Sequence, residues 1–282
     1  MTDVRGKRAL VTGASRGIGL LVARELAELG AEVAMWGRDA LALEAGARRI
    51  GARASWKVVD VGDVAAVRAA AAELGAVHVL VNNAGIVAGK SLLDLAPEDI
   101  QRTFRVNTLA HFWTIQAFLP AMLAADEGHI VTMSSAAGFC GAPRLADYAG
   151  SKAATIALDE SLRMELEQAG SHVQTTVVCP FLVDTGMFAG AKTRWPRLLP
   201  ILRPEAVAAR IARAVTNDER RVLMPRTVEM AFLARLFPVR WFDALASLLG
   251  VKESMNEFVG HGGATPAPTT PTRTKVSHAL RT

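Results

Sequence analysis

A tyrosine and a lysine four residues apart are the residues in this sequence whose types and spacing most directly suggest chemistry. Tyr148 and Lys152 lie in the run DYAGSK, and Tyr148 is the one tyrosine of the chain. On a helix this spacing places the phenol and the ammonium on the same face. A nearby cation stabilises the phenolate and lowers the tyrosine pKa from its usual value of about 10. We therefore predict that Tyr148 exchanges a proton near neutral pH.

A serine upstream of this pair extends the predicted site. Ser135 directly follows the run HIVTMS at 129–134, which is typical of a buried strand. At the end of that strand, its hydroxyl is expected to orient a carbonyl or alcohol oxygen beside Tyr148. Ser135, Tyr148 and Lys152 together predict proton-coupled oxidation or reduction at a C–O centre, with a hydride carrier bound nearby.

A glycine-rich turn near the start of the chain predicts the site of that carrier. The run GASRGIG at 13–19 separates an apolar strand-like run at 8–12 from an amphipathic run at 20–29. In a strand–turn–helix context, the glycines permit a tight turn and close backbone approach, and the helix N-terminus favours a pyrophosphate. Taken alone, such a turn also fits an ordinary loop. The candidate cofactor residues here are Gly13, Ser15, Arg16, Gly17, Ile18 and Gly19.

The end of the second predicted strand bears on which dinucleotide binds. An acid at this place would hydrogen-bond the ribose hydroxyls of NAD, but the sequence has Gly37 followed by Arg38 and Asp39. Arg38 and Arg16 can both approach a 2′-phosphate, so we expect NADP(H) rather than NAD(H). The alternatives are that Arg38 only faces solvent or pairs with Asp39.

The elements that must position these residues alternate between strand and helix. Strands are predicted at 8–12, 32–36, 54–59, 77–81, 128–133, 173–179 and 221–224. Helices are predicted at 17–29, 39–50, 63–74, 98–124, 149–169 and 204–216. Right-handed crossovers then give an α/β fold, a single Rossmann-type doubly wound parallel sheet of about seven strands flanked by helices. Ligands bind beyond the carboxyl ends of such strands, where the motifs fall.

Composition and charge limit the other classes of function. Hydrophobic residues make up 51% of the chain, enough for a large core, and we expect one catalytic domain over residues 1–260. The tail at 261–282 has the proline- and threonine-rich composition of a disordered segment. The net charge is +5, three units of which come from that tail, and no basic aromatic motif indicates nucleic-acid binding.

The cysteines indicate a reducing compartment, and the histidines indicate that the protein holds no metal. Cys140 and Cys179 have no metal-ligand spacing and are expected to be free thiols. The six histidines form no ligand pattern, so no metal is predicted, and His111 is expected to pack on a helix face. The first residues run directly into a strand, with neither a signal peptide nor a membrane anchor, so we expect a cytoplasmic location.

The glycine pattern, the run NNAG at 82–85 and the set Ser135, Tyr148 and Lys152 resemble the short-chain dehydrogenase/reductase superfamily. The resemblance covers roughly residues 5–260 and supplies further roles. It implies that Asn107 completes a proton relay with Tyr148 and Lys152. The cofactor contacts that it implies are Asp60, Val61, Asn83, Ala84, Gly85, Tyr148, Lys152, Pro180, Val183 and Thr185. At the position of Phe181 the family commonly has glycine.

Longer runs point to one branch of the superfamily. The runs NTLAHFWT at 107–114, FLPAM at 118–122 and TGMF at 185–188 resemble the retinol dehydrogenase and 17-beta-hydroxysteroid dehydrogenase type 11/13 branch. The resemblance implies lipophilic alcohol, aldehyde or ketone substrates. Members often carry an N-terminal hydrophobic anchor and an acidic strand-end residue that prefers NAD, and this sequence shows neither.

An apolar stretch after the cofactor motifs is the predicted substrate wall. With Ser135 and Tyr148, the candidate substrate residues are Phe181, Met187, Phe188 and Trp195. A mostly apolar pocket with few polar groups suits a small lipophilic carbonyl or alcohol. The same stretch also fits a subunit contact or a structural flap.

The segment at about 226–250 predicts two apolar helices separated by Pro238. Glu229, Arg235, Arg240 and Asp243 make it unsuited to crossing a bilayer. Three roles remain open: peripheral contact with a membrane surface, a roof over the substrate pocket, or a subunit interface. The helices at 98–124 and 149–169 match those that pair subunits in relatives, so a homodimer or homotetramer is expected.

The sequence as a whole predicts an NADP(H)-dependent oxidoreductase that acts on a retinoid-, steroid- or long-chain-aldehyde-like substrate. Two alternatives use the same features: a 3-oxoacyl-thioester reductase on the same scaffold, and a non-catalytic NADP(H)-binding sensor. The complete set Ser135, Tyr148 and Lys152 disfavours the sensor, which would not require it.

Overall fold

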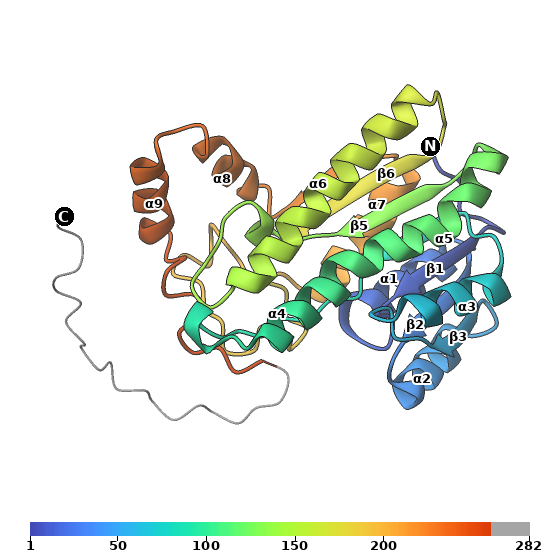
Figure 1. Ribbon diagram of the computed structural model, residues 1–282, viewed down its shortest axis with the longest axis horizontal. Coiled ribbons are helices and arrows are strands. Elements are labelled where there is room, and N and C mark those ends of the chain that lie inside the picture. Colours follow the sequence, from blue (N-terminus) through green and yellow to red (C-terminus); the bar gives the residue numbers. More distant parts are fainter. Residues whose placement is uncertain (261–282) are drawn as a thin grey trace.

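A computed structural model describes residues 1–260, and its core is one parallel sheet of seven strands in the order β3-β2-β1-β4-β5-β6-β7 (Figure 1). The strands are β1 (Arg8–Thr12), β2 (Glu32–Gly37), β3 (Ala54–Val58), β4 (Val79–Asn82), β5 (His129–Met133), β6 (Gln174–Pro180) and β7 (Arg221–Met224). The order reverses between β1 and β4, which makes the sheet doubly wound. The predicted fold class is confirmed. The tail at 261–282, predicted to be disordered, lies outside the described residues.

Helices cover both faces of the sheet. They are α1 (Gly17–Glu28), α2 (Ala40–Ile50), α3 (Val64–Leu74), α4 (Pro97–Phe104), α5 (Ala110–Ala125), α6 (Ala146–Gln168), α7 (Pro204–Thr216), α8 (Val228–Ala234) and α9 (Val239–Leu248). Residues of α1, α2 and α7 share one apolar core with the sheet, and residues of α3, α5 and α6 share a second. The two cores therefore lie on opposite faces of the sheet, as in a three-layer α/β domain.

Local sequence explains where several elements begin. Asp39 caps α2, because its carboxylate accepts from the Ala42 amide at 3.0 Å, and Asp63 caps α3 through the amides of Ala65 and Ala66. β1, β4 and β5 are apolar and almost entirely buried, as expected for strands covered on both faces.

The predicted helix at 98–124 is interrupted in the structure. A π-helical turn, Arg105–Leu109, separates α4 from α5 and contains Asn107. Such π-helical turns occur inside α-helices, often at functional sites. The predicted helix at 98–124 is therefore confirmed as the helical run Pro97–Ala125, although the π-helical turn within it was not predicted.

The helical run Pro97–Ala125 is, within the described chain, the one helix long and apolar enough to cross a membrane by length and composition. Its side chains Phe118 and Met122 are buried against the sheet. It also carries Asn107 beside the residues of the site, so we assign it to the protein core.

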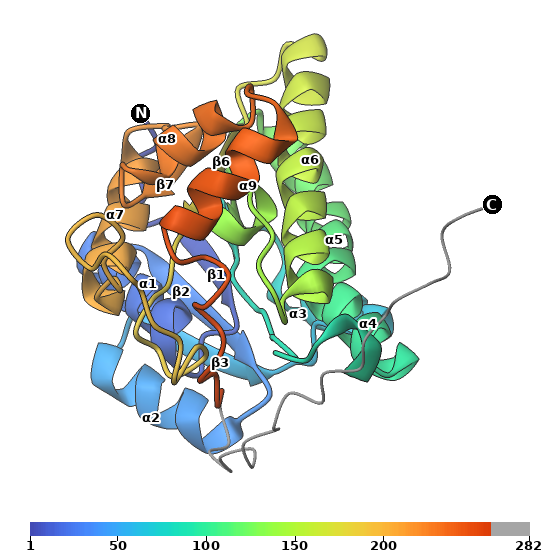
Figure 2. The same cartoon turned by 90° about the vertical axis from the view of Figure 1, so that its left-hand side faces the viewer.

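The last described residues, 226–260, fold over the carboxyl ends of the strands. α8 and α9 lie at that end of the sheet, and the segment 251–260, which we call the C-terminal strap, runs from α9 across it (Figures 1 and 2). The strand ends, where the sequence motifs fall, are therefore covered by residues from the last part of the described chain.

Candidate active site

Tyr148 and Lys152 lie on successive turns at the start of α6, and both side chains are buried. The Lys152 Nζ atom is 6.0 Å from the centroid of the Tyr148 ring. That ammonium donates to the Met133 carbonyl at 2.6 Å, and the Ser134 hydroxyl donates to the Lys152 carbonyl at 2.8 Å. The end of β5 thus holds the lysine on the same side of α6 as the tyrosine.

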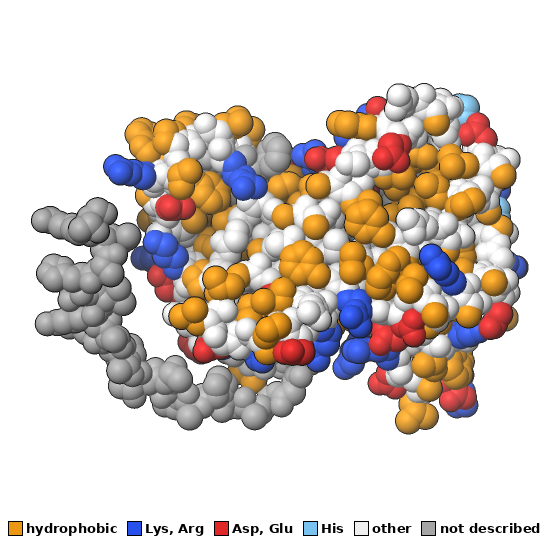
Figure 3. Space-filling view, viewed as in Figure 1, with side chains coloured by type: hydrophobic (Ala, Val, Ile, Leu, Met, Phe, Trp, Pro, Cys, Tyr) orange, Lys and Arg blue, Asp and Glu red, His pale blue; other side chains and the backbone are white. Residues whose placement is uncertain are grey.

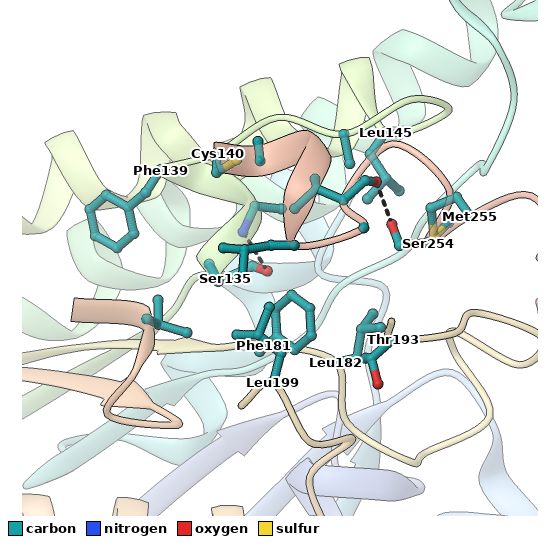
Figure 4. Close-up of a pocket in the computed structure, with 18 of the residues that line it drawn as sticks. Ser135, Phe139, Cys140, Leu145, Phe181, Leu182, Thr193, Leu199, Ser254 and Met255 are labelled. Carbon is teal, nitrogen blue, oxygen red and sulfur yellow. Dashed lines mark hydrogen bonds between the residues drawn. The ribbon is translucent and has the colours of Figure 1, made fainter. Parts of the chain in front are cut away.

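Ser135 follows β5 and faces the same space as Tyr148. Its Oγ accepts from the Ala137 amide at 3.1 Å and caps a short 3₁₀ turn, Ala136–Gly138. Its hydroxyl donates to the Pro180 carbonyl at 3.4 Å and is close enough to Tyr148 to lower the pKa of that phenol. Both residues line one cavity, and Figure 4 shows Ser135 pointing toward its interior. The structure therefore brings together the three residues that the sequence singled out.

The electrostatics of the tyrosine differ from the prediction. Burial raises the pKa of Tyr148 to about 12, and only the hydrogen bond from Ser135 acts in the opposite direction. Burial also lowers the pKa of Lys152 to about 8. The predicted lowering of the tyrosine pKa by Lys152 was wrong, because the ammonium is directed at Met133 and the apolar surroundings disfavour the phenolate. A phenol that stays protonated at neutral pH suits donation of a proton.

Asn107 lies in the π-helical turn and is completely buried. Its Nδ2 donates to the Ile86 carbonyl at 2.9 Å and to the Ser151 hydroxyl at 3.0 Å, while its Oδ1 accepts from the Ile86 amide at 2.8 Å. A Cβ added at Gly85 would lie 3.5 Å from Asn107 Oδ1 and 3.7 Å from Lys152 Nζ. Asn107 therefore joins the loop after β4 to α6 and lies close to the lysine; the proton relay stays a prediction.

The glycine turn is built against the loop that follows β4. Gly13 has a φ of 65°, and a Cβ there would lie 2.8 Å from the Cα of Ala84. Asn83 Nδ2 donates to the Thr12 carbonyl at 3.0 Å. The Thr12 hydroxyl accepts from the amides of Asn83 and Ala84 at 3.0 and 3.2 Å. The sequence prediction did not include Thr12 as a site residue, although its place at a strand end before a glycine turn was visible.

The first turn of α1 meets the segment after β6. Arg16 is the N-cap residue of α1 and offers no side-chain cap. A Cβ at Gly17 would contact the Thr185 side chain at 3.4 Å, so Thr185 lies beside the glycine turn. The Thr185 amide donates to the Val183 carbonyl at 2.9 Å, and Val183 pairs with Leu202. The two predicted cofactor motifs are therefore neighbours in space.

The end of β2 presents arginine rather than a carboxylate. Asp39 is engaged in capping α2, and within residues 1–260 neither Arg38 nor Arg16 forms an ion pair. Both arginines are exposed. A Cβ at Gly37 would lie 3.2 Å from the Ser15 hydroxyl, so the glycine turn touches this strand end.

Asp60 and Val61 lie beside the same strand end. The Val59 amide donates to the Gly37 carbonyl at 2.8 Å, and the Asp60 carboxylate accepts from the Gly62 amide at 2.9 Å. Val61 is buried. This neighbourhood fits the adenine end of a dinucleotide.

The residues present fit a bound dinucleotide. The turn at 13–19 packs so closely on the loop after β4 that a Cβ at Gly13 would overlap Ala84 and one at Gly19 would overlap the side-chain nitrogen of Asn83. The first backbone N–H groups of α1 have no acceptor within the helix and can donate hydrogen bonds to an anion. The other predicted cofactor residues lie near the carboxyl ends of the neighbouring strands: residues 83–85, Tyr148, Lys152 and the run from Pro180 to Thr185.

An apolar cavity of about 210 Å³ adjoins Ser135 and Tyr148. Of the other predicted substrate residues, Phe181 and Phe188 line it, and Figure 4 shows Phe181 below Ser135. Met187 and Trp195 are not among the lining residues. Trp195 is 49% exposed, and its indole donates to the Leu248 carbonyl at 3.0 Å. Trp195 thus fastens its loop to the end of α9, and its place in the substrate set stays a prediction.

The roof of this cavity comes from the segment at 226–250, so one of its three predicted roles is visible in the structure. The roof residues are Val228, Met230, Phe242, Leu245, Ala246 and Leu249. Further walls come from Leu145, Val251, Ser254 and Met255, which sequence reasoning missed. No motif marks these residues, and only the folded chain brings them to the site.

Metal-ligating side chains do not gather in the described part of the chain: no group of three or more His, Cys, Asp or Glu residues there could hold an ion. Cys140 and Cys179 are both free. His111 is fully buried, and burial, with a smaller effect of Lys152, holds its pKa well below the usual value.

Curated relatives match nearly the whole chain. It is 39% identical over 267 residues to epidermal retinol dehydrogenase 2 of Homo sapiens. The matched region covers 91% of this chain and 86% of the relative. It is 37% identical over 259 residues to estradiol 17-beta-dehydrogenase 11 of Rattus norvegicus, which covers 89% of this chain and 86% of the relative. The predicted branch is thereby confirmed.

Solved structures of similar fold include complexes with both nicotinamide cofactors. One is a short-chain dehydrogenase/reductase from Burkholderia phymatum in complex with NAD, with a TM-score of 0.76 and 28% identity, covering 84% of this chain and 95% of that one. Another is a metagenomic short-chain oxidoreductase in complex with NADP, with a TM-score of 0.66 and 33% identity, covering 79% and 97%.

The family model described as short chain dehydrogenase matches residues 7–195, which include the glycine turn and all the catalytic candidates. The chain therefore belongs to the short-chain dehydrogenase/reductase family and is an NAD(P)-dependent oxidoreductase that acts on CH–OH or C=O groups.

Proposed function

We propose that this protein is an NADP(H)-dependent reductase of a lipophilic carbonyl compound, of retinoid, steroid or long-chain aldehyde type. The observation that carries the proposal is the cavity beside Ser135 and Tyr148, whose walls are mostly Ala, Leu, Phe, Met and Val side chains. A substrate that places its oxygen between Ser135 and Tyr148 leaves its remaining atoms against this apolar wall.

The proposed mechanism uses the two hydroxyl groups together. The carbonyl oxygen of the substrate accepts hydrogen bonds from Ser135 and Tyr148, which polarise the C=O bond. A nicotinamide held by the glycine turn and the strand ends would supply the hydride for the carbonyl carbon. Tyr148, protonated at neutral pH, donates its proton to the oxygen, and an alcohol forms.

Lys152 and Asn107 would return a proton to Tyr148 after the reduction. The buried ammonium of Lys152, with its pKa of about 8, carries its charge at neutral pH and returns a proton to Tyr148. Asn107, near this ammonium, connects it toward the loop after β4. We further propose that Lys152 contacts the nicotinamide ribose, and that Val183 and Thr185 hold the carboxamide.

The proposed preference for NADP(H) rests on the end of β2. Exposed Arg38 and Arg16 flank a strand end whose one carboxylate, Asp39, is engaged in capping α2. Guanidinium groups with no acid between them suit a 2′-phosphate.

A panel of carbonyl compounds tests the proposed substrate class. NADPH absorbance is followed with retinal, a steroid ketone and a long-chain aldehyde, against a short polar ketone and an acetoacetyl thioester. We expect a kcat/KM for at least one lipophilic compound about tenfold or more above that for the short ketone. Preference for the thioester would favour the 3-oxoacyl-thioester reductase. NADPH binding with no turnover of any compound would favour the sensor.

A membrane surface is the partner that we propose for the outer side of α8 and α9. Exposed apolar side chains gather there (Figure 3): Leu233, Leu236, Phe237, Val239, Trp241 and Leu248. Since the inner side of α9 lines the cavity, this helix is apolar on both sides. An apolar surface of this kind, exposed to water, favours contact with lipid.

Charge favours an anionic lipid surface over other occupants. Arg226 and Arg235 flank α8 in sequence, Arg240 lies in α9, and all three are exposed. None of them forms an ion pair within residues 1–260. Each such cation near an anionic membrane contributes about 1 kcal/mol.

Sedimentation with liposomes tests this contact. We expect binding to anionic vesicles, weaker binding to neutral ones, and loss of binding in Trp241→Gln. Leu41→Gln, which removes an equally exposed apolar side chain from α2, is the control. Equal sedimentation of all three proteins, or none with the wild type, contradicts the proposal. With such contact the protein would reside in the cytoplasm at membrane surfaces.

Domain organisation and assembly complete the proposal. We propose that residues 1–260 form one catalytic domain, since all seven strands belong to one sheet. A homodimer or homotetramer through α5 and α6 is supported by exposed Phe112, Leu123 and Met164 on these helices. Analytical ultracentrifugation of the wild type and Met164→Glu measures this assembly directly.

A further inference from the structure

The C-terminal strap, residues 251–260, forms part of the substrate cavity. Val251, Ser254 and Met255 line it, and Figure 4 shows Ser254 and Met255 at one side. Met255 is 1% exposed, and both Met255 and Phe258 belong to the apolar cluster that contains Tyr148. The wall of the cavity therefore depends on how this last described segment is held.

One side of the strap is fastened to the segment that follows the cofactor motif at 180–185. The amides of Val259 and Gly260 donate to the Ala189 carbonyl at 2.8 and 3.2 Å. The Lys192 amide donates to the Ser254 carbonyl at 3.0 Å. These backbone bonds hold the strap to the segment at 189–192.

The other side of the strap meets the loop after β4 at Gly89. This glycine is buried and has a φ of +68°. The Phe258 ring fills the space that a Cβ at Gly89 would occupy. A side chain at position 89 would both strain the backbone and displace Phe258.

Arg144 joins these parts to the catalytic helix. It precedes α6 by two residues and Tyr148 by four, and its φ of +65° is one that few non-glycine residues adopt. Its Nε donates to the Gly89 carbonyl at 3.0 Å. Its Nη1 donates to the Met255 carbonyl at 3.0 Å and, at the limit of bonding distance, to the Asn256 carbonyl at 3.5 Å. One half-buried guanidinium thus bridges the loop after β4 and the strap.

The chemistry of this bridge requires arginine. The guanidinium is planar and presents donors in a fixed fork, so it can satisfy two carbonyls from different segments. A lysine ammonium is a compact point charge without this geometry. The unfavourable backbone conformation of Arg144 also indicates that surrounding contacts over-determine its position.

We propose that Arg144 is a positioning residue that latches the C-terminal strap to the entrance of α6 and so fixes the cavity wall against which the substrate binds. The latch follows from contacts within the fold, whereas its effect on substrate binding rests on the proposed function of the cavity. Arg144 contacts neither the cofactor motifs nor the hydroxyl groups of Ser135 and Tyr148. Loss of Arg144 is therefore expected to weaken the binding of substrates that are long enough to reach the strap.

Hydrogen–deuterium exchange of the strap amides tests the latch without any substrate. The variants are Arg144→Gln, Arg144→Lys and Gly89→Ala, and the control is Arg68→Gln, which removes an exposed arginine of α3. We expect faster exchange at 254–260 in all three variants and unchanged exchange in the control. Gly89→Ala loosens the strap without altering Arg144, so it remains informative if Arg144→Gln does not fold. Strap exchange at the wild-type rate in Arg144→Lys and Gly89→Ala overturns the proposal.

Kinetics with the folded variants test the consequence for substrate. With the best lipophilic carbonyl compound we expect KM to rise about tenfold, because the strap loses a charge-assisted hydrogen bond and holds the cavity wall in place for a smaller fraction of the time. The Kd for NADPH and the kcat for a short carbonyl compound should stay within about twofold. A looser strap with unchanged KM overturns the positioning role. If the wild type reduces no carbonyl compound, the proposed function fails, and exchange still decides whether Arg144 is a latch.

Discussion

The Lys152 ammonium donates to the carbonyl of Met133, the last residue of β5, at 2.6 Å. This bond directs the lysine charge toward the strand end instead of the phenol of Tyr148. Burial then dominates the chemistry of both side chains: it raises the pKa of the tyrosine to about 12 and lowers that of the lysine to about 8. The pair is therefore arranged as a protonated phenol beside a readily deprotonated amine.

The titration of Lys152 predicts an alkaline limb in the pH dependence of reduction. Its pKa of about 8 means that the amine loses its proton, and with it the capacity to reprotonate Tyr148, as the pH rises through that value. We expect kcat to fall about tenfold per pH unit above this pKa, as for one ionisation. In Lys152→Arg, whose guanidinium stays charged, kcat should be lower but independent of pH up to about 10. The same limb in both proteins would exclude Lys152 as its source.

Arg38 is predicted to determine cofactor preference. Arg38→Gln removes the exposed guanidinium beside Gly37, so the kcat/KM for NADPH should fall about tenfold or more, while that for NADH changes little. Arg49→Gln, an exposed arginine on α2, is the control. Equal losses with both cofactors would show that Arg38 does not recognise the 2′-phosphate.

Asn107 is predicted to contribute to both stability and turnover. Asn107→Ala leaves the amide and carbonyl of Ile86 without their partner, which should lower the free energy of unfolding by about 1–3 kcal/mol. If Asn107 also relays protons, kcat falls in the folded variant and the solvent isotope effect on kcat changes. A loss of stability with unchanged kcat would leave only the structural role.

Asp159 is predicted to make stability depend on pH. This buried carboxyl has its pKa raised from 3.8 to about 7, chiefly by burial. The folded state therefore holds a proton that the unfolded state releases, so the contribution of Asp159 to stability is greatest below pH 3.8 and is lost as the pH rises to about 7. Asp159→Asn should raise the free energy of unfolding at pH 8 by at most about 4 kcal/mol and have little effect near pH 4. Thermal unfolding at both pH values measures this difference, and an equal effect at both would refute the assignment.

The repeating part of the fold could be predicted because local signals agree with one another. Glycine turns, capping residues such as Asp39 and Asp63, and apolar runs at regular spacing each specify the same α/β order. The π-helical turn at Asn107 could not be predicted, because the turns on both sides of it have the sequence pattern of an ordinary helix. Its position depends on the hydrogen bonds that Asn107 makes with Ile86 and Ser151.

The motif residues of the site could be placed from sequence because parallel strands bring their carboxyl ends to one edge. The raised pKa of Tyr148 could not be predicted, because the apolar residues that bury the phenol come partly from the C-terminal strap, far away in sequence. The position of Trp195 outside the cavity lining could not be predicted for a related reason: its side chain turns to the end of α9, and composition alone does not show that direction. Arg144 has no motif, and only the folded loops give it two carbonyl partners.

The most direct test concerns the proton of Tyr148. Turnover of the best lipophilic carbonyl compound is compared between the wild type and Tyr148→Phe, with NADPH binding measured on the same samples. We predict that kcat falls on the order of 10²–10⁴-fold, the usual effect of losing a general acid, while the Kd for NADPH changes by less than about threefold. Turnover of Tyr148→Phe within about tenfold of the wild type would contradict the account, because another group would then have to supply the proton.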